Sequence, residues 1–200
     1  MKLFVTATGT DCGKTVVSAI LCQALNADYW KPVQTGAPPS DSSTVKNLVS
    51  FPIQIFPETH LFSEPVSPHY ASEIEGKKIK LSDFLLPETN NNLIVEGAGG
   101  LLVPLNEHGD CVIDLIHQFG LEVVLVIRLY LGCINHALLS INELKRNNIA
   151  IKGLIFNGTD QFGAISIIEK LSNVPTLLHL ANHAHIDSQV VSDCAKELKL

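Results

Sequence analysis

The chain has 200 residues and a formal net charge of -6, with 14 Lys and Arg against 20 Asp and Glu. Hydrophobic residues make up 46% and charged residues 17%, which excludes a disordered chain, and the acidic balance argues against a general nucleic-acid binder. At this length we predict one domain over residues 1–200, with a core that needs no disulfides.

Nothing in the sequence indicates a membrane protein or a metal-sulfur site. The longest apolar run covers residues 123–127, far short of the roughly 18 residues of a spanning helix. The first residues turn polar too soon for a signal peptide. The five cysteines are scattered without a C-x-x-C pair, and no ligand set surrounds the histidines. We therefore expect a cytoplasmic protein without a membrane partner.

Apolar stretches alternate with segments of helical periodicity along the chain. In chain order we predict a strand at 3–6, a helix at 15–25, a strand at 29–33, a short helix capped by Asp41 at 41–48, and an irregular Pro-rich segment at 51–65. A helix from Ser67-Pro68 to Gly76, a strand at 92–96, a helix at 110–119, a strand at 121–127, a helix at 134–146, a strand at 152–156, a helix at 161–171 and a docking helix within 187–200 follow. Near-continuous apolar strands between helices predict an α/β fold, in which helices cover both faces of a parallel β-sheet.

The first strand and helix are joined by Ala-Thr-Gly-Thr-Asp-Cys-Gly-Lys-Thr, residues 7–15. This loop resembles a P-loop, whose backbone N–H groups cradle phosphates together with the following helix N-terminus. Lys14 is predicted to neutralise the β- and γ-phosphates, and the Thr15 hydroxyl to hold Mg²⁺. The common G-x-x-x-x-G-K-[ST] pattern has Gly at the position of Thr8, whereas here Gly9 stands one residue later. The sequence thus predicts a P-loop-type fold with a variant phosphate loop.

Three further loops carry polar residues at predicted strand ends. Glu96 ends a buried strand before Gly97-Ala98-Gly99-Gly100, where an acidic residue reaches the metal of a P-loop; the alternative is a turn cap. Lys31 is costly to bury unless it meets an anion; the alternative is an extended lysine on an edge strand. The stretch 131–136 offers a second helix N-terminus for an anion; the alternative is an ordinary loop between a strand and a helix.

Six motifs in order resemble those of the dethiobiotin synthetase family over about residues 3 to 160. They are Gly13-Lys14-Thr15, Lys31-Pro32-Val33-Gln34-Thr35-Gly36, Ser40-Asp41, Glu64-Pro65-Val66-Ser67-Pro68-His69, Val95-Glu96-Gly97-Ala98-Gly99-Gly100 and Leu131-Gly132-Cys133-Ile134-Asn135-His136. The resemblance implies an ATP- and Mg²⁺-dependent ligase of biotin biosynthesis. Such an enzyme converts 7,8-diaminopelargonic acid, CO₂ and ATP into dethiobiotin, ADP and phosphate through a carbamate.

The resemblance also assigns roles to individual residues. Those implied as catalytic are Lys31, Lys14 and Thr10, and the implied Mg²⁺ ligands are Thr15, Asp41 and Glu96. The implied nucleotide contacts are Asp11, Cys12, Gly13, Lys14, Thr15, Val16, Asp41, Glu96, Gly97, Ala98, Gly99 and Asn157, the last an adenine contact. The implied substrate contacts are Thr35 and, around a distant carboxylate, Gly132, Cys133, Ile134 and Asn135 from the other subunit of a homodimer.

Some positions depart from the family pattern. Ala7 and Gly9 replace Gly and Asp of many members, and residues 178–182 lack the Gly and Pro that help to bind the base. Nucleotide preference therefore stays open. A second class, the partitioning and septum-placement ATPases, shares the expected fold and acts through a protein or lipid partner. Its members usually carry an extra Lys at the start of the P-loop, where this chain has none between residues 7 and 10.

Overall fold

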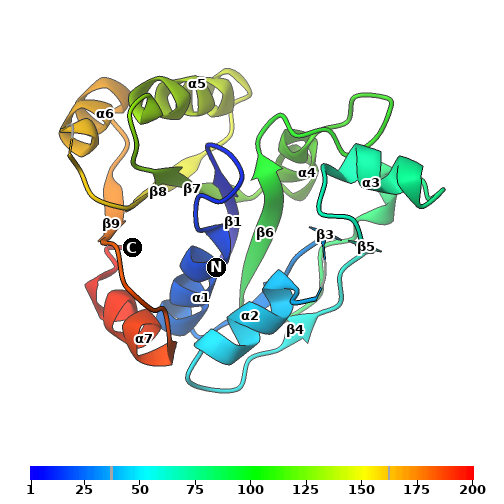
Figure 1. Cartoon of the computed structure of the whole chain (residues 1–200), viewed down its shortest axis with the longest axis horizontal. Coiled ribbons are helices and arrows are strands. Elements are labelled where there is room, and N and C mark those ends of the chain that lie inside the picture. Colours follow the sequence, from blue (N-terminus) through cyan, green and yellow to red (C-terminus); the bar gives the residue numbers. More distant parts are fainter. Residues whose placement is uncertain (37, 162) are drawn as a thin grey trace.

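A computed structural model describes residues 1–36, 38–161 and 163–200. Its centre is a seven-stranded sheet in the order β4-β2-β6-β1-β7-β8-β9, in which every neighbouring pair is parallel (Figure 1). The strands are β1 (Lys2–Ala7), β2 (Ala27–Trp30), β4 (Ile55–Phe56), β6 (Asn92–Gly100), β7 (Glu122–Arg128), β8 (Ile151–Asn157) and β9 (Thr176–Leu180). A separate parallel pair joins β3 (Val33–Thr35) to β5 (His60–Phe62).

Helices cover both faces of the large sheet. One face packs against α1 (Lys14–Leu25), α2 (Asp41–Leu48) and α7 (Ser188–Glu197). The other packs against α4 (Val112–Phe119), α5 (Cys133–Arg146) and α6 (Ala164–Ser172) (Figure 1). The helix α3 (Pro68–Ile74) packs against β3 and β5, and a 3-10 turn, η1, spans Leu81–Asp83. The predicted α/β architecture with helices on both faces is confirmed.

The alternating side chains of β1 explain this layering. Leu3 and Val5 join the cluster under α1, whereas Phe4 joins the opposite cluster. Successive strand side chains point to opposite faces, so a central strand must be apolar on both. β1 lies between β6 and β7, and the carboxyl ends of parallel strands meet at one edge. The loop after β1 therefore lies beside the ends of its neighbours.

The predicted strand at 29–33 is wrong in its extent. β2 ends at Trp30, and β3 begins at Val33 in the other sheet. Pro32 lacks an N–H group to continue the ladder, and its carbonyl accepts hydrogen bonds from the N–H groups of Thr59 and His60. Lys31 is consequently at the junction of two sheets.

Other boundaries also differ from the predictions. The segment predicted as irregular contains the short strands β4 and β5, and β9 was not predicted. The helix predicted at 161–171 begins at Ala164, after Gly163 in a left-handed conformation with φ of 61°, and residue 162 lies outside the described residues. The tail forms α7 as predicted and packs against α1, with Val191 fully buried. No helix in the described part of the chain combines the length and apolar character needed to cross a membrane.

Candidate functional site

A cleft of about 1020 Å³ opens at the carboxyl ends of β1, β2 and β6. The predicted residues that line it are Thr10, Asp11, Gly13, Lys14, Thr15, Lys31, Thr35, Asp41, Glu96, Ala98 and Gly99. Its opposite wall is formed by Ser63 and by residues 65–68, which lead into α3. The fold thus assembles one site from segments that are distant in sequence.

The loop between β1 and α1 has the features of a phosphate-binding loop. Gly13 is the N-cap of α1 and has a φ of 92°, a left-handed conformation that favours glycine. The Lys14 Nζ atom folds back and donates to the carbonyl of Gly9 at 3.3 Å. Lys14 is buried, and this burial lowers its pKa despite the nearby carboxylate of Glu96. A largely desolvated ammonium group whose one hydrogen-bond partner is a neutral carbonyl is suited to binding an anionic ligand.

Lys31 lies between two carboxylates. Its Nζ atom is 2.6 Å from Oδ2 of Asp41 and 3.0 Å from Oε1 of Glu96, and the residue is only 4% exposed. Burial alone would lower the pKa of Lys31, but the two carboxylates outweigh it and raise the pKa above its ordinary value. The alternative of an extended lysine on an edge strand is therefore wrong.

Glu96 is fully buried and accepts hydrogen bonds on both oxygens. The Thr15 hydroxyl donates to Oε1 at 3.1 Å, and the Lys31 Nζ atom donates to the same oxygen at 3.0 Å. The Tyr29 hydroxyl donates to Oε2 at 2.9 Å. Glu96 does not end its strand as predicted, because β6 continues to Gly100. The strand places the carboxylate directly beside the P-loop helix.

Asp41 is at the first position of α2, and its predicted role as cap is wrong. Ser40 is the N-cap and accepts from the N–H group of Ser43 at 3.2 Å, which leaves the Asp41 carboxylate free to pair with Lys31. Burial opposes the charged form of Asp41, but Lys31 outweighs it and lowers the pKa of the carboxyl. The Gln34 side chain accepts from the N–H group of Asp41 at 3.1 Å and donates to the carbonyls of Thr35 and Gly36, so it holds this loop in place.

The oxygen atoms around Lys31 are ligands of the kind that a hard cation prefers. The Asp41 and Glu96 carboxylates converge on the ammonium group of Lys31, and the Thr15 hydroxyl donates to the same Glu96 oxygen. Mg²⁺ prefers oxygen ligands and commonly takes one or two carboxylates, with water and phosphate completing its shell. Among the residues described, no group of three or more His, Cys, Asp or Glu side chains forms a protein-only metal cage. The chemistry of these donors fits Mg²⁺ bound together with a nucleotide.

Several predicted residues support the cleft without lining it. Cys12 is buried, with its Sγ atom 3.5 Å from the Thr8 hydroxyl, and Val16 packs into the core. Gly97 lies against Phe4, whose ring would be 2.8 Å from a Cβ atom at that position. These residues shape the backbone around the site.

Asn157 lines an adjacent cavity of about 610 Å³ that shares Asp11 with the cleft. Its amide donates to the carbonyl of Cys12 at 2.9 Å and fills the space that a side chain at Gly13 would need. Asn157 therefore ties the end of β8 to the P-loop.

The loop before α5 does not reach the cleft of its own chain. Among the residues lining that cleft, Gly132, Cys133, Ile134 and Asn135 are all absent. Gly132 is the N-cap of α5 with a φ of 109°, and Asn135 is exposed. The Tyr130 hydroxyl and His136 Nδ1 of the same segment are hydrogen-bonded to each other. This helix N-terminus faces outward.

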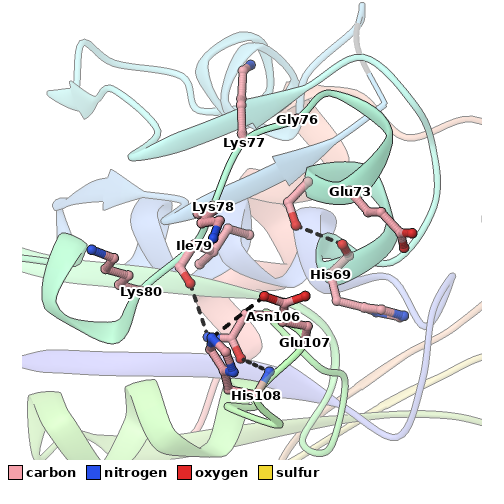
Figure 2. A pocket seen from close by; sticks show the side chains of 11 residues that line it. His69, Glu73, Gly76, Lys77, Lys78, Ile79, Lys80, Asn106, Glu107 and His108 are labelled. Carbon is pink, nitrogen blue, oxygen red and sulfur yellow. Dashed lines mark hydrogen bonds and ion pairs between the residues drawn. The ribbon is translucent and has the colours of Figure 1, made fainter.

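A further, smaller cavity lies beside α3, as Figure 2 shows. Three lysines line it, but Lys77 extends away from Asn106 (Figure 2). The Lys77 Nζ atom forms an ion pair with Glu75 at 2.7 Å. Asn106 has a structural role, because its amide donates hydrogen bonds to the carbonyl of Ile79 and to the carboxylate of Asp110. The polar groups of this cavity do not converge on one point, whereas Asp41 and Glu96 in the cleft both contact Lys31.

The sequence does not single out two residues of the site. Tyr29 lies in an apolar segment whose pattern predicts only a strand. Gln34 lies in the second motif, where roles are implied for Lys31 and Thr35 but not for Gln34. The available signal was the same for both: a group that must form hydrogen bonds, placed beside residues predicted to be buried.

The parallel sheet, the loop after β1 and the buried carboxylate on the adjacent strand define a P-loop ATPase-type protein. A family model described as an AAA domain matches residues 1–190. A solved ParA family ATPase from Chlorobium tepidum TLS has a TM-score of 0.52 at 16% identity, covering 98% of this chain and 99% of that one, and shows a likeness of fold alone.

Closer relatives identify the family. The ATP-dependent dethiobiotin synthetase BioD of Cytophaga hutchinsonii is 51% identical over 199 residues, which cover 98% of this chain and 96% of that protein. The enzyme of the same name from Christiangramia forsetii is 44% identical, with 98% and 95% covered. The chain belongs to the dethiobiotin synthetase family.

Proposed function

We propose that this protein is an ATP-dependent dethiobiotin synthetase that uses Mg²⁺ and acts as a homodimer. Family membership over nearly the whole chain supports the reaction. The observation that carries it is Lys31, held between Glu96 and Asp41 beside the P-loop lysine in one cleft. Two cations and a set of oxygen ligands together suit a reaction in which a carbamate attacks a phosphate.

The proposed reaction has three steps. One amine of 7,8-diaminopelargonic acid adds to CO₂ and loses a proton, which gives a carbamate. A carbamate oxygen then attacks the γ-phosphorus of ATP, and the bond to ADP breaks. The second amine attacks the carbonyl carbon of the mixed anhydride, phosphate leaves, and the cyclic urea of dethiobiotin closes.

The residues of the cleft are suited to stabilise the negative charge that develops on the carbamate and the phosphoryl group in these steps. Lys14 and the N-terminus of α1 are placed to bind the transferring phosphoryl group. Lys31 is kept charged by its two carboxylates and supplies a cation to the carbamate. Thr10, Asp11 and Thr35 line the same cleft and would orient the diamine. Thr15, Asp41 and Glu96 would hold Mg²⁺, which supplies charge neutralisation at the phosphates.

The outward-facing start of α5 supports the homodimer. The substrate carboxylate lies at the end of its chain opposite the two amines, and a helix N-terminus stabilises an anion. Leu131, directly before this helix, is 81% exposed, and Tyr130 beside it is 40% exposed. Apolar side chains of this exposure are suited to burial against a second subunit.

Mixing two inactive variants tests the shared site. Asn135→Asp places a negative charge where the partner's substrate carboxylate would bind, and Lys31→Met removes the cation of the cleft. Each variant alone is expected to be inactive. A refolded equimolar mixture should recover about a quarter of wild-type turnover, because half the dimers are mixed and each has one intact site. No recovery, despite subunit exchange shown by mass spectrometry, would contradict the shared site.

The reaction itself is tested by the substrate dependence of phosphate release. Release of phosphate from ATP should require both the diamine and bicarbonate, and dethiobiotin should form in equal amount by mass spectrometry. Hydrolysis without the diamine, stimulated by a protein or a lipid surface, would favour a partitioning-type switch ATPase, whose fold this chain shares. The tail gives that alternative little support, because α7 packs against α1.

A further inference from the structure

The two oxygens of the Glu96 carboxylate have different partners. Oε1 faces Thr15 and Lys31, the two groups that belong to the cleft. Oε2 accepts a hydrogen bond from the buried Tyr29 hydroxyl at 2.9 Å. One oxygen thus contacts residues that line the cleft, and the other contacts a side chain of the protein core.

Tyr29 is a rigid source of that hydrogen bond. It lies on β2, directly beside β6, in register with Ile94. The side chain is fully buried in the cluster under α1, so its ring cannot turn away from Glu96 without opening the core. Tyr29 does not line the cleft and therefore touches no ligand there.

We propose that Tyr29 is a positioning residue that sets the metal preference of the site. By holding Oε2, it makes Glu96 a ligand through one oxygen, which favours Mg²⁺ over Ca²⁺. The inference rests on the proposed binding of Mg²⁺ by Thr15, Asp41 and Glu96. It adds a determinant that the six sequence motifs do not contain.

Coordination chemistry supplies the reason. Mg²⁺ requires near-octahedral geometry with ligands at about 2.0–2.1 Å, and a carboxylate binding through both oxygens fits this poorly. Ca²⁺ accepts 6–8 ligands at about 2.3–2.6 Å and readily takes bidentate carboxylates. A carboxylate with a free second oxygen can rotate to bind through both. The Tyr29 hydroxyl opposes that rotation and thereby penalises the larger ion.

Removal of the hydroxyl is the test. Wild type and Tyr29→Phe are saturated with a non-hydrolysable ATP analogue and loaded with Mn²⁺, and displacement of Mn²⁺ by Mg²⁺ or Ca²⁺ is followed by electron paramagnetic resonance. We expect Mg²⁺ to bind the variant about 3- to 10-fold more weakly, which corresponds to the net contribution of one ordinary hydrogen bond. Ca²⁺ should bind as well as before or better, so that the Mg²⁺/Ca²⁺ affinity ratio falls. Equal weakening of both ions, or no change in either, would overturn the proposal, as would failure of Mg²⁺ to displace Mn²⁺ from the wild type.

Two controls separate positioning from general damage. Tyr70→Phe removes a hydroxyl from the half-exposed Tyr70 and should leave the ratio unchanged. In a Glu96→Gln background, Tyr29→Phe should no longer change the ratio, because its target carboxylate is gone. A full effect in that background would show that Tyr29 acts by another route. Since no turnover is involved, failure to form dethiobiotin would refute the proposed function without deciding this question.

Discussion

Substitution of Lys31 by Met is expected to abolish turnover and to destabilise the fold together. The Nζ atom is the cation that pairs with Asp41 and with the fully buried Glu96. Its removal leaves a carboxylate in the core without a counter-charge, which lowers the free energy of unfolding by about 3–5 kcal/mol. Loss of a preorganised cation at the reacting atoms lowers kcat by about 10²–10³-fold or more. Urea unfolding and phosphate release measure the two effects.

The double variant Lys31→Met, Glu96→Gln separates them. Neutralising the carboxylate removes the unpaired charge, so much of the lost stability should return, while turnover stays absent. If Lys31→Met keeps near-normal turnover, the role of Lys31 at the carbamate is wrong. If it loses no stability, the ion pairs seen here contribute little to folding.

The same ion pairs predict how stability depends on pH. The folded-state pKa of Asp41 is lowered, so its contribution is present above its ordinary pKa and is lost as the pH falls through the folded value. The folded-state pKa of Lys31 is raised, so its contribution is present below its ordinary pKa and is lost as the pH rises through the folded value. Both losses should be smaller in Lys31→Met, and urea midpoints across the acid and alkaline limbs measure them.

Substitution of Lys14 by Met should have an equally large effect on catalysis but should not destabilise the fold. Lys14 makes one hydrogen bond, to the carbonyl of Gly9, and burial lowers its pKa, so its charge opposes folding when no phosphate is bound. We expect kcat to fall by about 10²–10³-fold, because charge on the transferring phosphoryl group loses its cation. Stability without nucleotide should be unchanged or raised.

Thermal unfolding with and without ATP checks this prediction. The wild type should be stabilised by the nucleotide, and Lys14→Met should gain much less. Lys46→Met, on the exposed side of α2, is the matched control and should behave as the wild type in both measurements. If Lys14→Met is strongly destabilised in the absence of nucleotide, the inference that the Lys14 charge opposes folding until an anion binds is wrong.

Much of the architecture was determined by local patterns in the sequence. Apolar strands such as 121–127 can be recognised from the pattern of a few consecutive residues. The glycines around Lys14 can be recognised because a tight turn requires glycine locally. The order of strand, P-loop and helix therefore predicted the parallel sheet and the edge at which the site lies. Lys31 and Glu96 were also found in this way, because a charge in an apolar run is conspicuous by itself.

Only the tertiary structure decided what surrounds those charges. Lys31 and Glu96 are 65 positions apart, and Tyr29 and Glu96 are 67 apart, yet their side chains are within hydrogen-bond distance. The division of the 29–33 segment between two sheets likewise follows from long-range strand pairing, because β2 pairs with β4 and β6 whereas β3 pairs with β5. Hydrogen bonds and ion pairs depend on distances of about 3 Å, and such distances between remote segments exist only once the sheet has set its strand order and register.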